Sequence, residues 1–303
     1  PANRMKKKIK VCIVGLGRAG RFHLASINNL DLFDLKYVVD PGFSTQDDLV
    51  QKNDFILLED IEEALADDEL DAAIISPPTQ FHFECITRFL EAGKHVFTEK
   101  PLGKSLTEIQ TCFELSAKRK KALFLGFQRR YDRNFLALKS KVEKLEPVKI
   151  IKTSSRDHPQ PSLDYLKISG NIFHDMLIHD FDMLIFLLGK EPPISVFAYG
   201  HAYDDEIRGI PDLDTVMVIL KYKTGLICSI DTSRNATYGY DQRLEIFGEG
   251  AWRSLKMSGT IRSRCIPQRE WKCQLSMSLS LNAIKTLMRL KLRTLERRLR
   301  RTG

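Results

Sequence analysis

The chain lacks several features that would assign it to a common class of protein. Its six cysteines form no CxxC pair and no metal-ligand spacing, which argues against a zinc module and a disulfide framework. Apolar runs of about 18 residues, the length that spans a membrane, are also missing. The opening "PANRMKKKIK" leads directly into a strand rather than into a signal core. A cytoplasmic protein with reduced cysteines and no bound metal is therefore expected.

The chain has a formal net charge of +8, but most of its length has no excess of basic residues. Residues 251–303 hold 14 lysines and arginines against two glutamates, a net charge of +12. Residues 1–250 hold 33 basic and 37 acidic residues. The body of the chain is therefore mildly acidic, and its charge gives no reason to expect a nucleic-acid partner.

Short apolar runs alternate with amphipathic segments over the first 125 residues. The runs that predict strands are "IKVCIVGLG", "KYVVD", "AAIISPP" and "HVFTEKP". Between them, segments such as "QFHFECITRFLEAG" follow a helical period, and this one closes on a glycine suited to a helix C-cap. Repetition of strand, helix and strand predicts a doubly wound parallel sheet of the α/β class over residues 1–125.

The pattern changes to longer β-like runs from about Val148 onward. They are "VKIIKTSS", "ISVFAYGHAY", "DTVMVILKYKTG", "LICSIDTS" and "QRLEIFG". One strong helix at 171–188 lies among them in the sequence. This combination predicts an α+β domain with a mostly antiparallel open sheet over residues 126–250. Residues 251–303 differ in composition and are treated as a separate tail.

A glycine-rich turn follows the first expected strand. In "GLGRAG", Gly15, Gly17 and Gly20 have the G-x-G-x-x-G spacing, which lets the backbone approach a pyrophosphate at a helix N-terminus. A second strand ends in Asp40, 20 residues after Gly20, where a carboxylate accepts hydrogen bonds from an adenosine ribose diol. Together they predict a dinucleotide site. Since "DPGFST" offers no cation for a 2′-phosphate, NAD is favoured over NADP.

Two further patterns carry candidate chemistry. Lys100, in "TEKP", comes at the carboxyl edge of a predicted parallel strand, where α/β sheets bind ligands, although a solvated surface lysine is the more ordinary interpretation. In "GNIFHDMLIHDFDML", an apolar helix carries Asp175, His179 and Asp182 within about 60° of one another around its axis. A histidine one turn from a carboxylate is typical of an oriented proton acceptor, and a satisfied core pair is the alternative. His174 lies on another face, so a two-histidine metal site is not expected.

The order and separation of several motifs resemble one family. The motifs are "GLGRAG", "SPPTQFH", "HVFTEKPL", "GFQRRYD" and "GNIFHDMLIHDFDM". From residue 8 to about 250 the chain resembles the glucose-fructose oxidoreductase and inositol dehydrogenase family. The resemblance implies an NAD-binding Rossmann domain, followed by a domain that binds substrate and takes part in a homo-oligomer, a dimer or a tetramer. One departure is Gln128, where the family more often has asparagine.

The resemblance also implies the site residues. The lysine of the E-K-P motif and the D-x-x-x-H pair form the family's catalytic triad and correspond to Lys100, Asp175 and His179. These three residues are expected to contact the substrate together with Arg130, His158 and Tyr238. The residues expected to contact the cofactor are Gly15, Leu16, Gly17, Arg18, Ala19, Gly20, Asp40, Ser76, Pro77, Thr79, His82, Glu99 and Lys100.

The implied reaction is the NAD-dependent oxidation of a secondary hydroxyl of a cyclic polyol, first of all myo-inositol to its 2-keto form. His179 is expected to take the hydroxyl proton, and Asp175 to fix the imidazole tautomer and stabilise its protonated form. Lys100 is expected to favour the developing alkoxide by its charge. scyllo-Inositol, a related polyol or a pyranose sugar stays open as the substrate, since one relocated hydroxyl changes the preference without changing the triad.

The tail contains no Val, Phe, Tyr or Asp and holds both tryptophans, unlike the continued sheet and acidic final helix that the resemblance implies. A shifted reading frame, an alternative exon or a wrong gene model is the simplest explanation. The rival hypothesis is an amphipathic helix in "LNAIKTLMRLKLRTLERRLRR" that lies on an anionic membrane, since no zinc, helix-turn-helix or RNA-binding signature supports a nucleic-acid role. The tail puts stability and assembly in question. A nucleotide-binding protein without catalysis, or a nonproductive isoform, is therefore the alternative to an enzyme.

Overall fold

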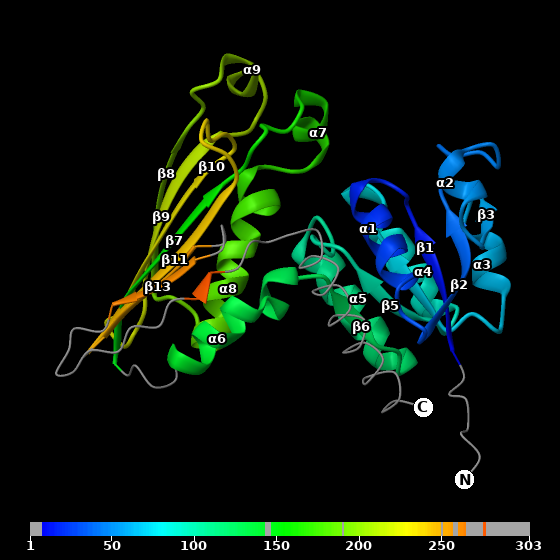
Figure 1. Cartoon of the computed structure of the whole chain (residues 1–303), viewed down its shortest axis with the longest axis horizontal. Helices are drawn as coiled ribbons and strands as arrows, with labels where there is room; N and C mark the ends of the chain where they lie inside the picture. Colours follow the sequence, from blue (N-terminus) through cyan, green and yellow to red (C-terminus); the bar gives the residue numbers. More distant parts are fainter. Residues whose placement is uncertain are drawn as a thin grey trace, which may run out of the picture. The chain divides into compact units, whose positions relative to one another are not determined.

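The computed structural model describes residues 8–142, 147–189, 191–249, 251–256, 260–264 and 275–276 (Figure 1). The chain divides after Gln128 into two compact units, each described by itself. Unit 1 comprises the described residues up to Gln128, and unit 2 the described residues from Arg129 onward. Among the described helices, none has the length and apolar character needed to cross a membrane.

Unit 1 is built on a six-stranded sheet in the order β3-β2-β1-β4-β5-β6, in which all neighbours are parallel (Figure 1). Its strands are β1 (Ile9–Val14), β2 (Phe33–Val39), β3 (Ile56–Leu58), β4 (Ala72–Ile75), β5 (His95–Thr98) and β6 (Leu123–Leu125). The order reverses between β1 and β4, which places the switch point of a doubly wound sheet at the carboxyl ends of these strands. The predicted Rossmann sheet is confirmed.

The helical elements of unit 1 are α1 (Arg18–Ile27), α2 (Asp48–Gln51), α3 (Glu62–Ala66), the 3-10 turn η1 (Thr79–Phe81), α4 (His82–Glu91) and α5 (Leu106–Arg119). Two of these helices, α4 and α5, have an end that a particular residue type explains. After α4, Gly93 has a φ of +73°, the left-handed conformation expected of a glycine that ends a helix. At the start of α5, the hydroxyl of Ser105 accepts the backbone N–H of Glu108 at 3.1 Å.

Unit 2 contains an eight-stranded sheet in the order β14-β13-β12-β11-β7-β10-β9-β8. Its strands are β7 (Val148–Arg156), β8 (Ser195–His201), β9 (Thr215–Lys221), β10 (Ile227–Ser233), β11 (Asp241–Gly248), β12 (Ala251–Lys256), β13 (Thr260–Arg264) and β14 (Leu275–Ser276). Neighbours are antiparallel except for β7 and β10, which confirms the predicted mostly antiparallel sheet. The sheet continues into the segment that composition set apart, whereas the amphipathic helix expected at 281–301 lies outside the described residues.

One face of this sheet packs on α8, and the other is exposed in the part of the chain that the structure describes. The 3-10 turn η2 (Gln128–Tyr131) begins at the boundary between the units. The other helical elements of unit 2 are α6 (Arg133–Val142), α7 (Leu163–Ile168), the π-helical turn η3 (Phe173–Leu177), α8 (Ile178–Leu188) and α9 (Asp205–Arg208). Leu184 of α8 shares a buried core with Val218 and Ile230 of the sheet. Met217 and Ile219, which alternate with the buried residues of β9, are 55% and 41% exposed.

Candidate functional site

The glycine turn follows β1 at the carboxyl edge of the unit 1 sheet. Gly15 has a φ of +87°, and an added Cβ would lie 2.7 Å from the backbone of Pro77. At Gly20 an added Cβ would lie 1.9 Å from the carbonyl oxygen of Gly15. Gly17 differs, since nothing lies within 4 Å of an added Cβ and α1 begins directly after it. The turn thus combines tight internal packing with an open backbone side, as the approach of a pyrophosphate requires.

Asp40 follows β2 and is fixed against the glycine turn. Its Oδ2 accepts the backbone N–H of Leu16 at 2.6 Å, and its Oδ1 accepts the N–H of Gly42 at 2.9 Å. The carboxylate therefore lies at the turn where the sequence places a ribose-binding group. The side chain of Leu16 is fully buried, so this residue can offer a ligand only its backbone.

A cation that the sequence pattern did not reveal lies near Asp40. The guanidinium of Arg21 lies over the ring of Phe43, with 5.4 Å between Cζ and the ring centroid. Its Nε donates to the carbonyl oxygen of Leu16 at 3.2 Å. The segment "DPGFST" has no cation of its own, but the fold brings Arg21 against it from α1.

The end of β4 is tied to the glycine turn and to the E-K-P turn. The hydroxyl of Ser76 donates to the carbonyl oxygen of Gly15 at 3.0 Å. The ring nitrogens of His82 lie 2.6 Å from the carbonyl oxygen of Pro101 and 2.9 Å from that of Pro77. Burial lowers the pKa of His82. The side chain of His82 therefore connects the turns at Pro77 and Pro101, next to the other residues expected to contact the cofactor.

The E-K-P turn follows β5 at the same edge. Nε2 of the buried His23, on α1, lies 2.9 Å from Oε1 of Glu99, and the His23 ring packs edge-on against Phe97. Lys100 comes next and is half-buried, and its peptide bond to Pro101 is cis. His23 was missed from the sequence. A histidine on the buried face of the helix after a glycine turn was the available signal.

The segment with Asp175 and His179 is helical as predicted, but it is not a uniform α-helix. Residues Phe173–Leu177 form a π-helical turn, a feature frequent at functional sites, before α8 begins. Asp175 is 8% exposed, and its carboxylate accepts hydrogen bonds from the hydroxyl of Tyr165 at 2.9 Å and from Nη1 of Arg234 at 3.0 Å. His179 is half-buried in the first turn of α8. Neither Tyr165 nor Arg234 was expected from the sequence.

The two further aspartates of this segment are held by consecutive arginines of η2. The carboxylate of Asp182 accepts hydrogen bonds from Nε of Arg130 at 2.9 Å and from Nη2 at 2.6 Å. Asp180 accepts Nη1 of Arg129 at 3.0 Å and the hydroxyl of Ser155 at 2.8 Å. Burial raises the pKa of both carboxyls, and the arginines oppose that shift. An ion pair with η2 therefore accounts for Asp182, and Arg130 is oriented by it.

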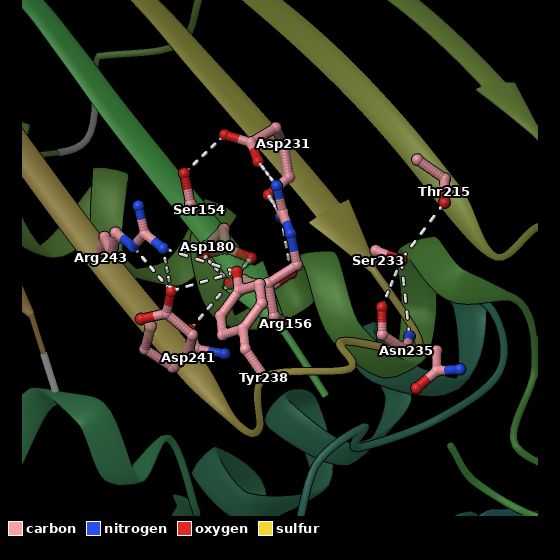
Figure 2. A network of polar contacts seen from close by, with 12 residues as sticks. Ser154, Arg156, Asp180, Thr215, Asp231, Ser233, Asn235, Tyr238, Asp241 and Arg243 are labelled. Carbon is pink, nitrogen blue, oxygen red and sulfur yellow. Dashed lines mark hydrogen bonds and ion pairs between the residues drawn. The ribbon is translucent and has the colours of Figure 1, made fainter. Parts of the chain in front are cut away.

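Tyr238 and His158 lie in loops next to the strands of unit 2. Figure 2 shows Tyr238 within a polar network, where its hydroxyl donates to Oδ2 of Asp241 at 3.3 Å. Nε of Arg243 donates to the same oxygen at 2.6 Å. Tyr238 is 62% exposed, and His158, shortly after β7, is also exposed.

The predicted cofactor residues of unit 1 gather at one edge. Each of the following comes directly after a strand or one residue later: the glycine turn after β1, Asp40 after β2, Ser76 after β4 and Lys100 after β5. The carboxyl ends of parallel strands meet at one edge of a sheet. The remaining candidates adjoin these strand ends and are Arg18, Ala19, Pro77 and Thr79. The candidates Asp175, His179, Arg130, His158 and Tyr238 belong to unit 2. Within the described ranges, no group of three or more His, Cys, Asp or Glu side chains suits a metal ion.

Two family models match the chain. The model of an oxidoreductase family with an NAD-binding Rossmann fold matches residues 9–127, and that of the GFO/IDH/MocA C-terminal domain matches residues 146–253. The chain therefore belongs to this family of NAD-dependent oxidoreductases, and unit 1 carries its NAD-binding domain. The resemblance drawn from the motifs is confirmed.

Relatives of this chain include named inositol dehydrogenases. The myo-inositol 2-dehydrogenase of Thermotoga maritima is 38% identical over 247 residues, which are 79% of this chain and 73% of that protein. The inositol 2-dehydrogenase of Rhizobium meliloti is 36% identical over 243 residues, again 79% and 73% of the two chains. The crystal structure of a myo-inositol dehydrogenase from Corynebacterium glutamicum is similar with a TM-score of 0.82 and 28% identity, covering 97% of this chain and 89% of that chain.

Proposed function

We propose that the protein oxidises a secondary hydroxyl of a cyclic polyol, converting myo-inositol to 2-keto-myo-inositol with reduction of NAD. The observation that carries this proposal is the 38% identity to a myo-inositol 2-dehydrogenase over most of both chains. The two matched ranges also contain every proposed catalytic residue: Lys100 lies within 9–127, and Asp175 and His179 lie within 146–253.

The residues at the edge of the unit 1 sheet fit NAD. The open backbone side of Gly17 and the N-terminus of α1 suit a pyrophosphate, and the carboxylate of Asp40 suits an adenosine ribose. Pro77, Thr79 and Glu99, at neighbouring strand ends, support the same placement. NAD bound by these residues would supply the hydride acceptor for the oxidation.

The chemical roles are assigned to three side chains. His179 takes the hydroxyl proton on a ring nitrogen as general base, a role that typically contributes about 10²–10⁴ in rate. Asp175 orients the imidazole and favours its protonated form, and Lys100 stabilises the developing alkoxide by its positive charge. The hydrogen bonds that Asp175 accepts from Tyr165 and Arg234 support this assignment, because a carboxylate with a fixed position can orient a base.

Three further residues are proposed to hold the remaining hydroxyls of the polyol. The bidentate contact with Asp182 fixes the guanidinium of Arg130, and a fixed donor suits a ring of hydroxyls. The exposed side chains of His158 and Tyr238 are available to a ligand. Asp241 and Arg243 limit the positions that the Tyr238 hydroxyl can adopt.

scyllo-Inositol is the second candidate substrate. The scyllo-inositol 2-dehydrogenase (NAD(+)) of Bacillus subtilis is 31% identical over 249 residues, which are 80% of this chain and 72% of that protein. The two inositols differ in the orientation of one hydroxyl, so the same base and the same lysine serve either reaction. The residues that contact that hydroxyl decide between the two substrates.

A homo-oligomer is proposed as the working form of the protein. Large apolar side chains gather on the sheet face away from α8, and exposed apolar patches mark interaction surfaces. They are Phe197 at 55%, Tyr199 at 73%, Met217 at 55%, Ile219 at 41% and Phe247 at 40% exposure. Size-exclusion chromatography with light scattering measures the assembly, and a monomer at micromolar concentration would contradict this part of the proposal.

The decisive experiment is a screen of polyols and sugars with the full chain. NADH absorbance reports turnover, and cofactor binding is measured separately by quenching of intrinsic fluorescence. Turnover with myo-inositol above that with scyllo-inositol and glucose supports the proposal. Binding of NAD without turnover of any polyol or sugar would instead favour a nucleotide-binding protein that has lost catalysis.

A further inference from the structure

A fully buried arginine lies against the proposed catalytic aspartate. Arg234, in the loop after β10, is 0% exposed. Its Nη1 donates to Oδ2 of Asp175 at 3.0 Å, its Nη2 to Oδ2 of Asp212 at 2.7 Å, and its Nε to the carbonyl oxygen of Leu213 at 3.2 Å. All three nitrogens of the guanidinium therefore have an acceptor, and its orientation is fixed.

Asp212 extends this contact to the beginning of the π-helical turn. Its Oδ1 accepts the backbone N–H of Ile172 at 2.7 Å, and Ile172 directly precedes η3. The same oxygen accepts the N–H of Leu213 at 2.8 Å. Asp212 thus links the Arg234 side chain to the backbone at the start of the turn that carries Asp175, so that both the Asp175 side chain and the start of its turn are held.

The other oxygen of Asp175 is held from α7. The hydroxyl of Tyr165 donates to Oδ1 of Asp175 at 2.9 Å. Loss of water around this hydroxyl and the negative charge of Asp175 raise the pKa of Tyr165, and Asp157 raises it further. The phenol therefore stays protonated and keeps its donor role. Part of the Tyr165 ring remains accessible, with 44% of the residue exposed.

The charges of this cluster do not cancel. Two carboxylates, Asp175 and Asp212, share the one guanidinium of Arg234, so the group keeps one net negative charge. Burial of a charge is costly unless it is paired and hydrogen-bonded, which explains why each of these groups has several partners. The remaining negative charge would stabilise a positive charge nearby. His179, four residues after Asp175, acquires such a charge when its imidazole is protonated.

We propose that Arg234, Asp212 and Tyr165 act as positioning residues, which orient Asp175 and set how strongly its carboxylate favours the protonated form of His179. The inference rests on the proposed function, because it treats His179 as the base. It adds that the strength of this base is controlled from three other segments of unit 2. Removal of a donor to Asp175 leaves its negative charge less shielded, which stabilises the protonated imidazole.

The test uses Tyr165→Phe in the full chain, because this change removes one hydroxyl from a partly exposed ring. Oxidation needs the unprotonated imidazole, so kcat/KM rises with pH along its acid limb. The midpoint of that limb is expected to move to higher pH by about half a unit to one unit, and kcat to fall roughly tenfold, while NAD affinity stays unchanged. Tyr203→Phe is the matched control, since Tyr203 is 72% exposed and its ring packs against His201.

A second variant and a second readout keep the inference testable. Arg234→Lys keeps the charge but loses the fork that joins Asp175 to Asp212, so a fall in kcat of about tenfold or more is expected with normal NAD binding. NMR titration of the His179 ring, assigned with His179→Ala, gives the midpoint without turnover. An inactive wild-type protein would contradict the proposed function. A His179 midpoint that is the same in Tyr165→Phe and Tyr203→Phe would overturn this inference.

Discussion

In unit 1 the candidate cofactor site is made largely of backbone at strand ends, whereas in unit 2 the proposed catalytic aspartate is held by the side chains of a buried arginine and a tyrosine. The glycine turn packs so closely that a Cβ at Gly20 would lie 1.9 Å from a carbonyl oxygen. In unit 2, the position of Asp175 depends on Arg234 and Tyr165, which come from separate segments. Steric packing therefore fixes the glycine turn of unit 1, whereas electrostatic contacts and hydrogen bonds fix Asp175 in unit 2.

This difference predicts how each unit responds to mutation. In unit 1 a single added methyl group is expected to act through steric overlap, with little dependence on pH. In unit 2 a change that keeps the size but removes a charge or a donor is expected to act through electrostatics, with a shifted pH profile. Comparing the pH dependence of small substitutions in the two units therefore tests whether unit 1 depends on packing and unit 2 on charge.

The largest effect is expected at His179. His179→Ala removes the proposed base, and kcat should fall by about 10²–10⁴ while NAD affinity is retained. His174→Ala is the matched control, because His174 is exposed, lies on the same segment and contacts Asn171. Steady-state NADH formation and fluorescence titration with NAD measure the two quantities. Turnover of His179→Ala close to that of His174→Ala would remove the base from the mechanism.

Two alanine variants of the glycine turn separate ligand contact from packing. Gly17→Ala should fold normally, since an added Cβ meets nothing within 4 Å, but bind NAD at least about tenfold more weakly if the pyrophosphate approaches this backbone. Gly20→Ala should lower the free energy of unfolding by about 1–3 kcal/mol through overlap with Gly15. Urea denaturation and NAD titration distinguish the two. Normal NAD affinity in Gly17→Ala would place the cofactor elsewhere.

A smaller effect is expected at Asp40. Asp40→Ser removes a carboxylate that suits the ribose diol, so the Kd for NAD should rise about tenfold and the gap to NADP should narrow. Asp34→Ser, on the exposed side of β2, is the control. Because the fold brings Arg21 close, adding Arg21→Ala to Asp40→Ser should cancel any gain in NADP affinity. Unchanged NAD binding in Asp40→Ser would contradict the assignment.

The smallest effect concerns the pH dependence of unit 1 stability. Burial is the main cause that lowers the pKa of His95 from 6.5 to about 4, and its Nδ1 accepts the N–H of Ala122 at 3.0 Å. Between these values the unfolded chain binds a proton that the folded chain does not. The stability contributed by neutral His95 is thus complete above pH 6.5 and lost as pH falls toward 4.

His95→Asn keeps an acceptor for Ala122 and removes the titration. The urea midpoint of this variant should fall less between pH 7 and pH 5 than that of the wild type, by an amount equivalent to about 1 kcal/mol. His158→Asn is the control, since His158 is exposed. The same loss of stability in His95→Asn and wild type would show that His95 does not carry the effect.

The fold could be predicted from the sequence because its signals are local. Alternation of apolar runs with helical segments predicted the parallel sheet, and the longer β-like runs after Val148 predicted the mostly antiparallel one, as the two observed sheets confirm. The glycine spacing identified a turn whose packing the structure explains at Gly15 and Gly20. Motif order identified the family, which the matched models confirm.

The partners of the candidate residues could not be predicted in the same way. A helical wheel placed Asp175, His179 and Asp182 on one stripe, but it could not reveal the π-helical turn at Phe173–Leu177 or the partner of Asp182, Arg130. Arg234 is 59 residues from Asp175 in the sequence, and no periodic pattern connects positions so far apart. Arg21, absent from the segment after Asp40, reaches it only through the packing of α1.

The sequence by itself determined the two sheets, the glycine turn with Asp40, the family, and the lysine, aspartate and histidine proposed for catalysis. Only the tertiary structure decided which polar side chains meet: Arg234 and Tyr165 with Asp175, Arg130 with Asp182, and His23 with Glu99. The physical reason is the separation along the chain between the residues that interact. Turns, caps and periodicity arise between neighbours in the chain, whereas a buried charge finds its partner only where distant segments pack together and exclude water.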